Sequence, residues 1–161
     1  MIFVTVGTNE ARFDRLLSAL AGTRLDERIV IQHGHSSPIG PPHAELVDFL
    51  SFDAMTEKIR EARVVVTHAG VGSVMVALAN GKRPVVVPRR KSFGEAVDDH
   101  QLQLGRRFAA AQLVTFVEAP EALADALLHT PEEAATAIPR TSMLAGELRR
   151  FVEGVLAPAA G

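Results

Sequence analysis

Short runs of β-branched and apolar residues alternate with segments of helical periodicity along most of this chain. The apolar runs predict strands at residues 2–6, 29–31, 45–50, 64–67, 84–88 and 113–117. The periodic segments predict helices at residues 11–21, 54–61, 73–80, 99–111, 121–129 and 142–156. Such alternation is typical of βα units around a parallel sheet. We therefore predict an α/β fold: a Rossmann-like parallel sheet with helices on both faces.

Length and composition indicate a single globular domain over residues 1–161. Hydrophobic residues make up 47% of the chain and charged residues 22%, a balance that supports a buried core and argues against disorder. The formal net charge of −2 gives no reason to expect a nucleic-acid partner. The absence of cysteine excludes disulfides, thiol catalysis and cysteine-bound metals. The first residues lack the features of a signal peptide and no apolar run could span a bilayer, so we expect a cytoplasmic protein.

A glycine-rich loop follows the fourth predicted strand and reads Thr67-His68-Ala69-Gly70-Val71-Gly72-Ser73. We expect a helix from Ser73 onward, whose first free N–H groups face the loop and can bind an anion. Gly70 and Gly72 have no Cβ to keep a phosphate from the backbone, and Ser73 can cap the helix or donate its hydroxyl. A tight turn that needs glycine only for its own conformation would look the same.

Four loops lie at the carboxyl ends of the predicted strands, where open parallel sheets bind ligands: residues 7–9, 32–35, 68–73 and 89–100. A single glycine follows the first strand, which disfavours a dinucleotide-dependent dehydrogenase, and no lysine-containing P-loop is present. The three histidines of residues 33–43 lack the spacing and the carboxylate neighbours of a metal site, so we expect loop histidines and no metal.

Four motifs occur in order along the chain: FVTVGT at residues 3–8, HAGVGS at 68–73, GKRPVVVP at 81–88 and DDHQ at 98–101. Together they resemble the C-terminal domain of family-28 glycosyltransferases over about residues 2–128. The resemblance is greatest to stand-alone members, namely the small subunit of a two-component UDP-N-acetylglucosamine transferase and bacterial exopolysaccharide glycosyltransferase subunits. It implies that this chain is the donor-binding half of a split GT-B glycosyltransferase.

The resemblance also implies a reaction and a partner. The expected reaction is inverting transfer of a sugar from a UDP-sugar to a lipid-linked or polysaccharide acceptor, without a metal or other cofactor. A second, membrane-associated subunit would bind the acceptor and recruit this chain to the inner face of the membrane. Two alternatives remain open: a scaffold that has lost donor binding, and another nucleotide-sugar enzyme such as an epimerase.

Donor-binding roles follow from the matching loops. In the family, the glycine-rich loop contacts the donor phosphates, and a glutamine at the start of a later helix contacts the sugar or the diphosphate. The predicted donor-binding residues are Gly7, Thr8, His68, Gly70, Val71, Gly72, Ser73, Arg89, Asp98, Asp99, His100 and Gln101. We assign no catalytic base to this chain.

Some of these residues have a second interpretation. His68 can hydrogen-bond the neighbouring loop instead of a ligand. Arg89 begins a basic run in a polar loop that solvent, a partner or an anionic membrane surface could contact. Asp98 or Asp99 can be an N-cap of the helix that follows.

The chain departs from the family at Val76, where most members have a glutamate that accepts hydrogen bonds from the ribose. Valine accepts no hydrogen bond, so ribose recognition must use other residues or be absent. We hypothesise that Asp98 or Asp99 supplies the missing carboxylate, with Glu95 as a further candidate.

The last predicted helix, at residues 142–156, has an apolar stripe. That stripe can pack on the chain's own sheet, on the partner subunit or on a second copy in a homodimer.

Overall fold

The computed structural model describes residues 1–130, in which six parallel strands form one sheet. The strands are β1 (Ile2–Thr5), β2 (Ile29–Gln32), β3 (Glu45–Val47), β4 (Val64–His68), β5 (Val85–Val87) and β6 (Thr115–Phe116). Their order across the sheet is β3-β2-β1-β4-β5-β6, and every pair is parallel. The predicted Rossmann-like parallel sheet is therefore confirmed.

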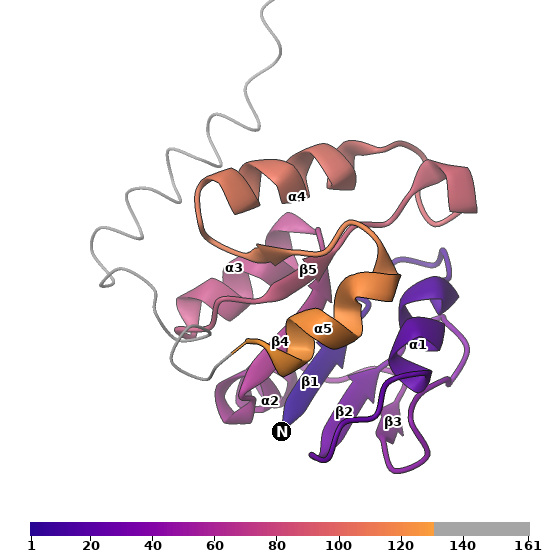
Figure 1. Ribbon diagram of the computed structural model, residues 1–161, viewed down its shortest axis with the longest axis vertical. Helices are drawn as coiled ribbons and strands as arrows, with labels where there is room; N and C mark the ends of the chain where they lie inside the picture. The colour runs from indigo at the N-terminus through magenta and orange to yellow at the C-terminus, as the bar shows by residue number, and fades with distance from the viewer. Residues whose placement is uncertain (131–161) are drawn as a thin grey trace, which may run out of the picture.

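Helices cover both faces of this sheet, as the alternating pattern predicts (Figure 1). They are α1 (Asp14–Ala21), α2 (Phe52–Glu61), α3 (Val71–Ala79), α4 (His100–Ala110) and α5 (Leu123–Leu128), with 3-10 turns at Lys91–Phe93 and Pro120–Ala122. Helices α1 and α5 share a core cluster with one face of the sheet. Helices α2 and α3 pack on the opposite face, and α4 packs beside α3. Within residues 1–130, no helix has the length and apolarity needed to cross a bilayer.

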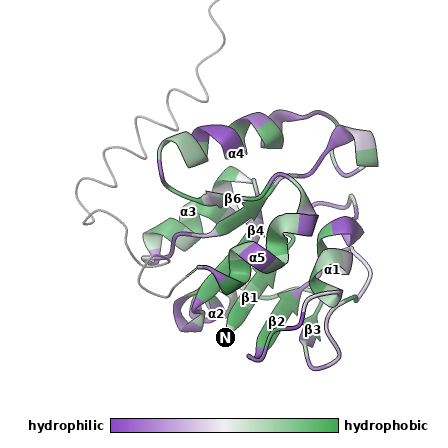
Figure 2. Cartoon of the chain, viewed as in Figure 1, coloured by the Kyte–Doolittle hydropathy of each residue, from purple (hydrophilic) through white to green (hydrophobic). Residues whose placement is uncertain are grey.

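The central strands are apolar on both sides because both sides are covered. In β1, Ile2 and Val4 point into the cluster with α1 and α5, whereas Phe3 points into the cluster with α2 and α3. All three side chains are fully buried. Figure 2 shows the strands mostly in hydrophobic colour, and hydrophilic colour on parts of α2, α4 and α5.

Several predicted elements are shorter in the structure. The strand predicted at residues 45–50 ends at Val47, because β3 is an edge strand and the chain then turns toward α2. The strand predicted at residues 113–117 pairs only over Thr115–Phe116. Helix α1 begins at Asp14 rather than at residue 11. The helix predicted at residues 142–156 lies outside the described residues.

The strand order creates a crevice beside β1. The chain builds β2 and β3 on one side of β1, and then returns to build β4, β5 and β6 on the other side. The connections behind β1 and β4 therefore leave the sheet in opposite directions, and ligands bind at such a switch point in open parallel sheets. The fold thus brings the loop after β1 and the glycine-rich loop after β4 together.

Candidate functional site

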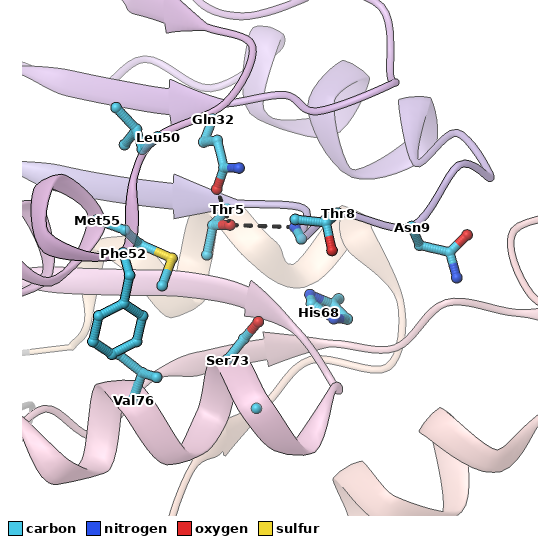
Figure 3. Close-up of a pocket in the computed structure, with 12 residues that line it drawn as sticks. Thr5, Thr8, Asn9, Gln32, Leu50, Phe52, Met55, His68, Ser73 and Val76 are labelled. Atoms are coloured by element: carbon cyan, nitrogen blue, oxygen red, sulfur yellow. Dashed lines mark hydrogen bonds between the residues drawn. The ribbon is translucent and has the colours of Figure 1, made fainter.

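A cavity of about 610 Å³ opens at the carboxyl ends of β1 and β4 (Figure 3). Its wall combines the ends of β1, β2 and β4, the loop after β1, and the first turns of α2 and α3. None of the residues known to line it carries a charged side chain at neutral pH. The lining residues are Thr5, Gly7, Thr8, Asn9, Gln32, Leu50, Phe52, Met55, His68, Gly72, Ser73 and Val76.

The cavity has an apolar end and a polar end. Figure 3 shows Phe52 and Met55 of α2 on the same side as Val76 of α3, with Leu50 nearby. Thr8, His68 and Ser73 lie toward the other side. A ligand with one hydrophobic part and one anionic or hydroxyl-rich part would match this division.

Hydrogen bonds fix the polar groups at the base of the cavity. The Thr5 hydroxyl donates to Oε1 of Gln32 at 2.6 Å, and the Gly7 N–H donates to the Thr5 hydroxyl at 3.2 Å. Thr5 and Gln32 are both buried. These bonds connect the end of β1 to β2 and to the start of the loop after β1.

The N-terminus of α3 borders the cavity. The helix begins at Val71 with Gly70 as its N-cap, and its first backbone bond runs from the Val74 N–H to the Gly70 carbonyl at 3.1 Å. Our prediction that Ser73 begins or caps this helix is wrong, because Ser73 is already in the first turn. N–H groups at the start of a helix have no partner within it. Those of Val71, Gly72 and Ser73 are therefore available to an anion at this end of the cavity.

The imidazole of His68 lies against two glycines. A Cβ on Gly7 would be 2.5 Å from its Cε1, and a Cβ on Gly70 would clash with its Nε2. Gly7 also has φ of +79°, which favours glycine for a second reason. His68 therefore fills the side of Gly70 on which a Cβ would lie, and Gly70 is not among the residues that line the cavity. A Cβ on Gly72, by contrast, would meet nothing within 4 Å.

His68 is neutral at physiological pH. Burial lowers its pKa to about 4, and the nearby positive charge of Arg89 adds to the effect. A neutral imidazole has one N–H to donate and one nitrogen that accepts. His68 can therefore hydrogen-bond a ligand, but it brings no positive charge to the cavity.

Arg89 does not line the cavity and is not solvated. Its side chain is fully buried, although it begins a polar loop. The guanidinium donates to the carbonyls of Ala11 at 2.7 Å and Val6 at 2.9 Å, and lies over the ring of Phe13 at 4.8 Å. Arg89 therefore does not contact the cavity directly, and its side chain is not part of a solvated basic surface.

The predicted residues near the start of α4 also lie outside the cavity wall. Asp98 accepts from the His100 N–H at 3.0 Å, and His100 is exposed at the surface. Asp99 occupies the N-cap position of α4, but its carboxylate accepts from the Lys91 N–H at 3.1 Å. Gln101 accepts from the Arg89 N–H at 3.2 Å. These residues organise the loop after β5.

The hypothesis that a carboxylate replaces the one missing at Val76 stays a prediction, and none of its three candidates lines this cavity. Val76 lines the cavity as an apolar wall residue. Asp98 and Asp99 are outside the wall, and Glu95 is buried in an ion pair with Arg15. No carboxylate is present among the lining residues of the described chain.

Sequence motifs did not identify the apolar wall formed by Leu50, Phe52 and Met55. Leu50 and Phe52 flank Ser51, the N-cap of α2, whose side chain accepts from the Ala54 N–H. An aromatic residue directly after a helix cap was the signal available in the sequence. In the structure, the Phe52 side chain is 65% exposed. Its relation to the cavity depends on α2 lying beside α3 in the fold.

No group of three histidine or acidic side chains that could hold a metal is found within residues 1–130. His33, for example, places its Nδ1 within 3.1 Å of two backbone carbonyls, those of Gly34 and Ser36.

The sequence of this chain is similar to those of glycosyltransferases. Residues 1–153 match the family described as Glycosyltransferase family 28 C-terminal domain. The chain is 30% identical over 118 residues to the human UDP-N-acetylglucosamine transferase subunit ALG13, a match that covers 66% of this chain and 10% of the human protein. It is 30% identical over 117 residues to the Yarrowia lipolytica protein of the same name, covering 65% of this chain and 58% of that one. The match therefore spans less than two thirds of either relative.

The fold itself recurs in solved structures. The calicheamicin glycosyltransferase CalG4 superposes with a TM-score of 0.61, covering 97% of this chain and 38% of that one. The two sequences are 20% identical, so the similarity concerns the fold alone.

Proposed function

The chain belongs to the family of glycosyltransferase family 28 C-terminal domains, and from this we propose that it is the donor-binding subunit of a two-component inverting glycosyltransferase. In this proposal the cavity binds a UDP-sugar. A separate subunit binds a lipid-linked or polysaccharide acceptor. The ALG13 relatives are subunits of a UDP-N-acetylglucosamine transferase, which supports an assembly of this kind.

The observation that carries the proposal is the start of α3 at the cavity. The N–H groups of its first turn have no partner within the helix, and Gly72 lines the cavity with open space where a Cβ would lie. When a glycosidic bond to UDP breaks, negative charge develops on the departing diphosphate. A helix N-terminus stabilises such charge through its N–H groups and its dipole. Ser73 adds a hydroxyl on the same helix turn.

In the proposal, the partner subunit supplies the base that acts on the acceptor. Inverting transfer needs a group that removes a proton from the acceptor hydroxyl. The lining residues include no carboxylate, and a His68 with a pKa of about 4 is a weak base at pH 7. In the proposal, therefore, this chain binds the donor and stabilises the leaving group, while the membrane-associated subunit supplies the base and brings the chain to the inner face of the membrane.

The test is reconstitution. We expect the isolated chain to bind UDP weakly, as measured by calorimetry, and to transfer no sugar. Transfer should appear when the acceptor-binding subunit, sought among neighbouring reading frames, is added. Titrations with dTDP and its sugars control for the nucleotide base. Robust transfer by the isolated chain would overturn the two-component proposal.

Val76 favours a second candidate, a scaffold subunit that no longer binds donor. Its side chain offers nothing to a ribose diol, and no lining carboxylate replaces it. This candidate predicts that neither UDP nor a UDP-sugar binds, with or without the partner. An epimerase, by contrast, would convert a nucleotide-sugar without any acceptor.

A further inference from the structure

Arg89 is a buried cation whose contacts are almost all uncharged. Its side chain has no exposed surface, and its guanidinium donates to the carbonyls of Ala11, Val6 and Glu95, the last at 3.3 Å. Its Nε is buried without a hydrogen-bond partner. Burial lowers the pKa of Arg89, but a guanidinium stays protonated in proteins. The charge therefore persists in a dry environment.

The acidic group nearest in the network is shared with another arginine. The Glu95 carboxylate accepts from Nε of Arg15 at 2.9 Å and from its Nη2 at 2.8 Å, and also accepts from the Arg90 N–H at 3.0 Å. Arg89 contributes to no ion pair found within residues 1–130. Arg15, Arg89 and Glu95 thus form a cluster of two cations and one anion, with one positive charge in excess.

This excess charge lies directly behind the polar end of the cavity. Arg89 donates to the Val6 carbonyl, which belongs to the same peptide unit as the Gly7 nitrogen. Gly7 in turn contacts His68, and both line the cavity. The positive charge of Arg89 also acts on His68, since it contributes to the lowered pKa of that imidazole. The field of the guanidinium therefore reaches the cavity wall.

A buried cation without a direct counter-charge destabilises a fold. An anion bound on the other side of the thin wall formed by Gly7 and His68 would offset that cost. No lining residue of the cavity has a cationic side chain, so Arg89 would supply the positive charge that an anion needs there.

We propose that Arg89 is a positioning residue that stabilises a bound diphosphate from behind the cavity wall, as a buried counter-charge without direct contact. The inference rests on the proposed function, in which the anion is the diphosphate of a UDP-sugar. Two effects combine in Arg89. Its hydrogen bonds hold the loop after β1 against the loop after β5, and its charge favours the anionic part of the ligand over the neutral part.

The test compares charged and neutral probes on the full-length chain. Inorganic pyrophosphate, UDP and uridine are titrated by calorimetry and by the amide NMR shifts of Gly72 and Ser73. Arg89→Met removes the charge, and Arg89→Lys keeps it. We expect Arg89→Met to weaken pyrophosphate and UDP about tenfold, as expected for loss of one charge at medium range. Uridine affinity should change less than about twofold, and Arg89→Lys should stay close to the wild type.

Glu95→Gln raises the net positive charge of the cluster, whereas Arg89→Met lowers it. This second variant keeps the proposal testable if Arg89→Met does not fold. It removes the negative charge from the cluster while its amide can still accept from Arg15. We expect the preference for UDP over uridine to increase about threefold. An unchanged preference would overturn the proposal.

The outcomes separate this inference from the proposed function. Equal losses for UDP and uridine in Arg89→Met would show that Arg89 only shapes the loop, and would leave donor binding intact. Wild-type binding of pyrophosphate that depends on Arg89, without any binding of UDP or uridine, would support the counter-charge and overturn the donor-binding proposal. Wild-type binding of none of the three probes would overturn both.

Discussion

Gly70 and Gly72 belong to the same motif in the sequence, but their surroundings in the structure differ. Gly70 is enclosed by the imidazole of His68, whereas Gly72 faces open space at the start of α3. Gly70 is thus needed by the protein itself. Gly72 is not needed by any contact within the described chain, and its backbone N–H faces the proposed diphosphate.

Gly72→Ala separates folding from ligand binding. Alanine is the better helix former, so we expect the free energy of unfolding to rise by about 0.5–1 kcal/mol. The added methyl group occupies the space in front of the helix N-terminus, so UDP affinity should fall about tenfold. Thermal unfolding and calorimetry measure the two effects.

Gly70→Ala is the matched control for Gly72→Ala. Its methyl group would collide with His68, so stability should fall instead of rising. If Gly72→Ala kept full UDP affinity, the diphosphate could not lie against this turn.

His68 makes stability depend on pH. Its pKa in the folded state, about 4, is below the value of 6.5 for an unperturbed histidine. The unfolded chain therefore binds the proton more tightly, so stability is complete above about pH 6.5 and is lost as the pH falls toward 4. At pH 4.5 the expected loss is about 2 kcal/mol relative to pH 7.

Urea unfolding of His68→Gln checks this assignment, because glutamine does not titrate. The variant should lose about 2 kcal/mol less than the wild type between pH 7 and pH 4.5. His129→Gln, at an exposed position, is the control. Identical pH dependence in the wild type and His68→Gln would contradict the prediction.

At the level of elements, α2 shapes the apolar end of the cavity. Its N-cap Ser51 accepts from the Ala54 N–H at 3.2 Å, and the residues that follow place Phe52 and Met55 at the cavity. Ser51 is the N-cap of α2 in the structure. The start of α2 at Phe52 therefore brings this aromatic side chain to the cavity wall.

Ser51→Ala should lower the free energy of unfolding by about 1 kcal/mol, because one N–H of the first turn loses its acceptor. Denaturant unfolding measures this change. Ser92→Ala, in an exposed turn, is the matched control and should be neutral. An equal effect of both substitutions would mean that the cap contributes nothing specific.

At the scale of the whole molecule, the order of the strands makes the site. Because β1 lies between β2 and β4, the loop after β1 meets the glycine-rich loop after β4 at one crevice. The described lining residues include no carboxylate that could act as a base. The reconstitution experiment therefore adds the acceptor-binding subunit. Catalysis in this proposal is a property of two chains.

The sequence by itself determined the fold class and the main loop of the site. Strand and helix periodicity depend on neighbours within a few residues, so the alternating pattern predicted a parallel α/β sheet, and the position of His68 at the end of β4 followed from it. The cavity then includes Gly7, Thr8, His68, Gly72 and Ser73 of the predicted donor-binding set.

Tertiary structure alone decided the rest. Arg89 reads as part of a polar surface loop, yet it is buried because residues 6 and 11, far away in the sequence, supply its acceptors. The sequence gives no sign that the ring of His68 occupies the side of Gly70 on which a Cβ would lie. Asp98 and Asp99 accept from nearby backbone N–H groups and do not line the cavity, which their positions in the sequence do not reveal. Each outcome depends on which distant atoms fill the space around a side chain, and local sequence patterns carry no information about that packing.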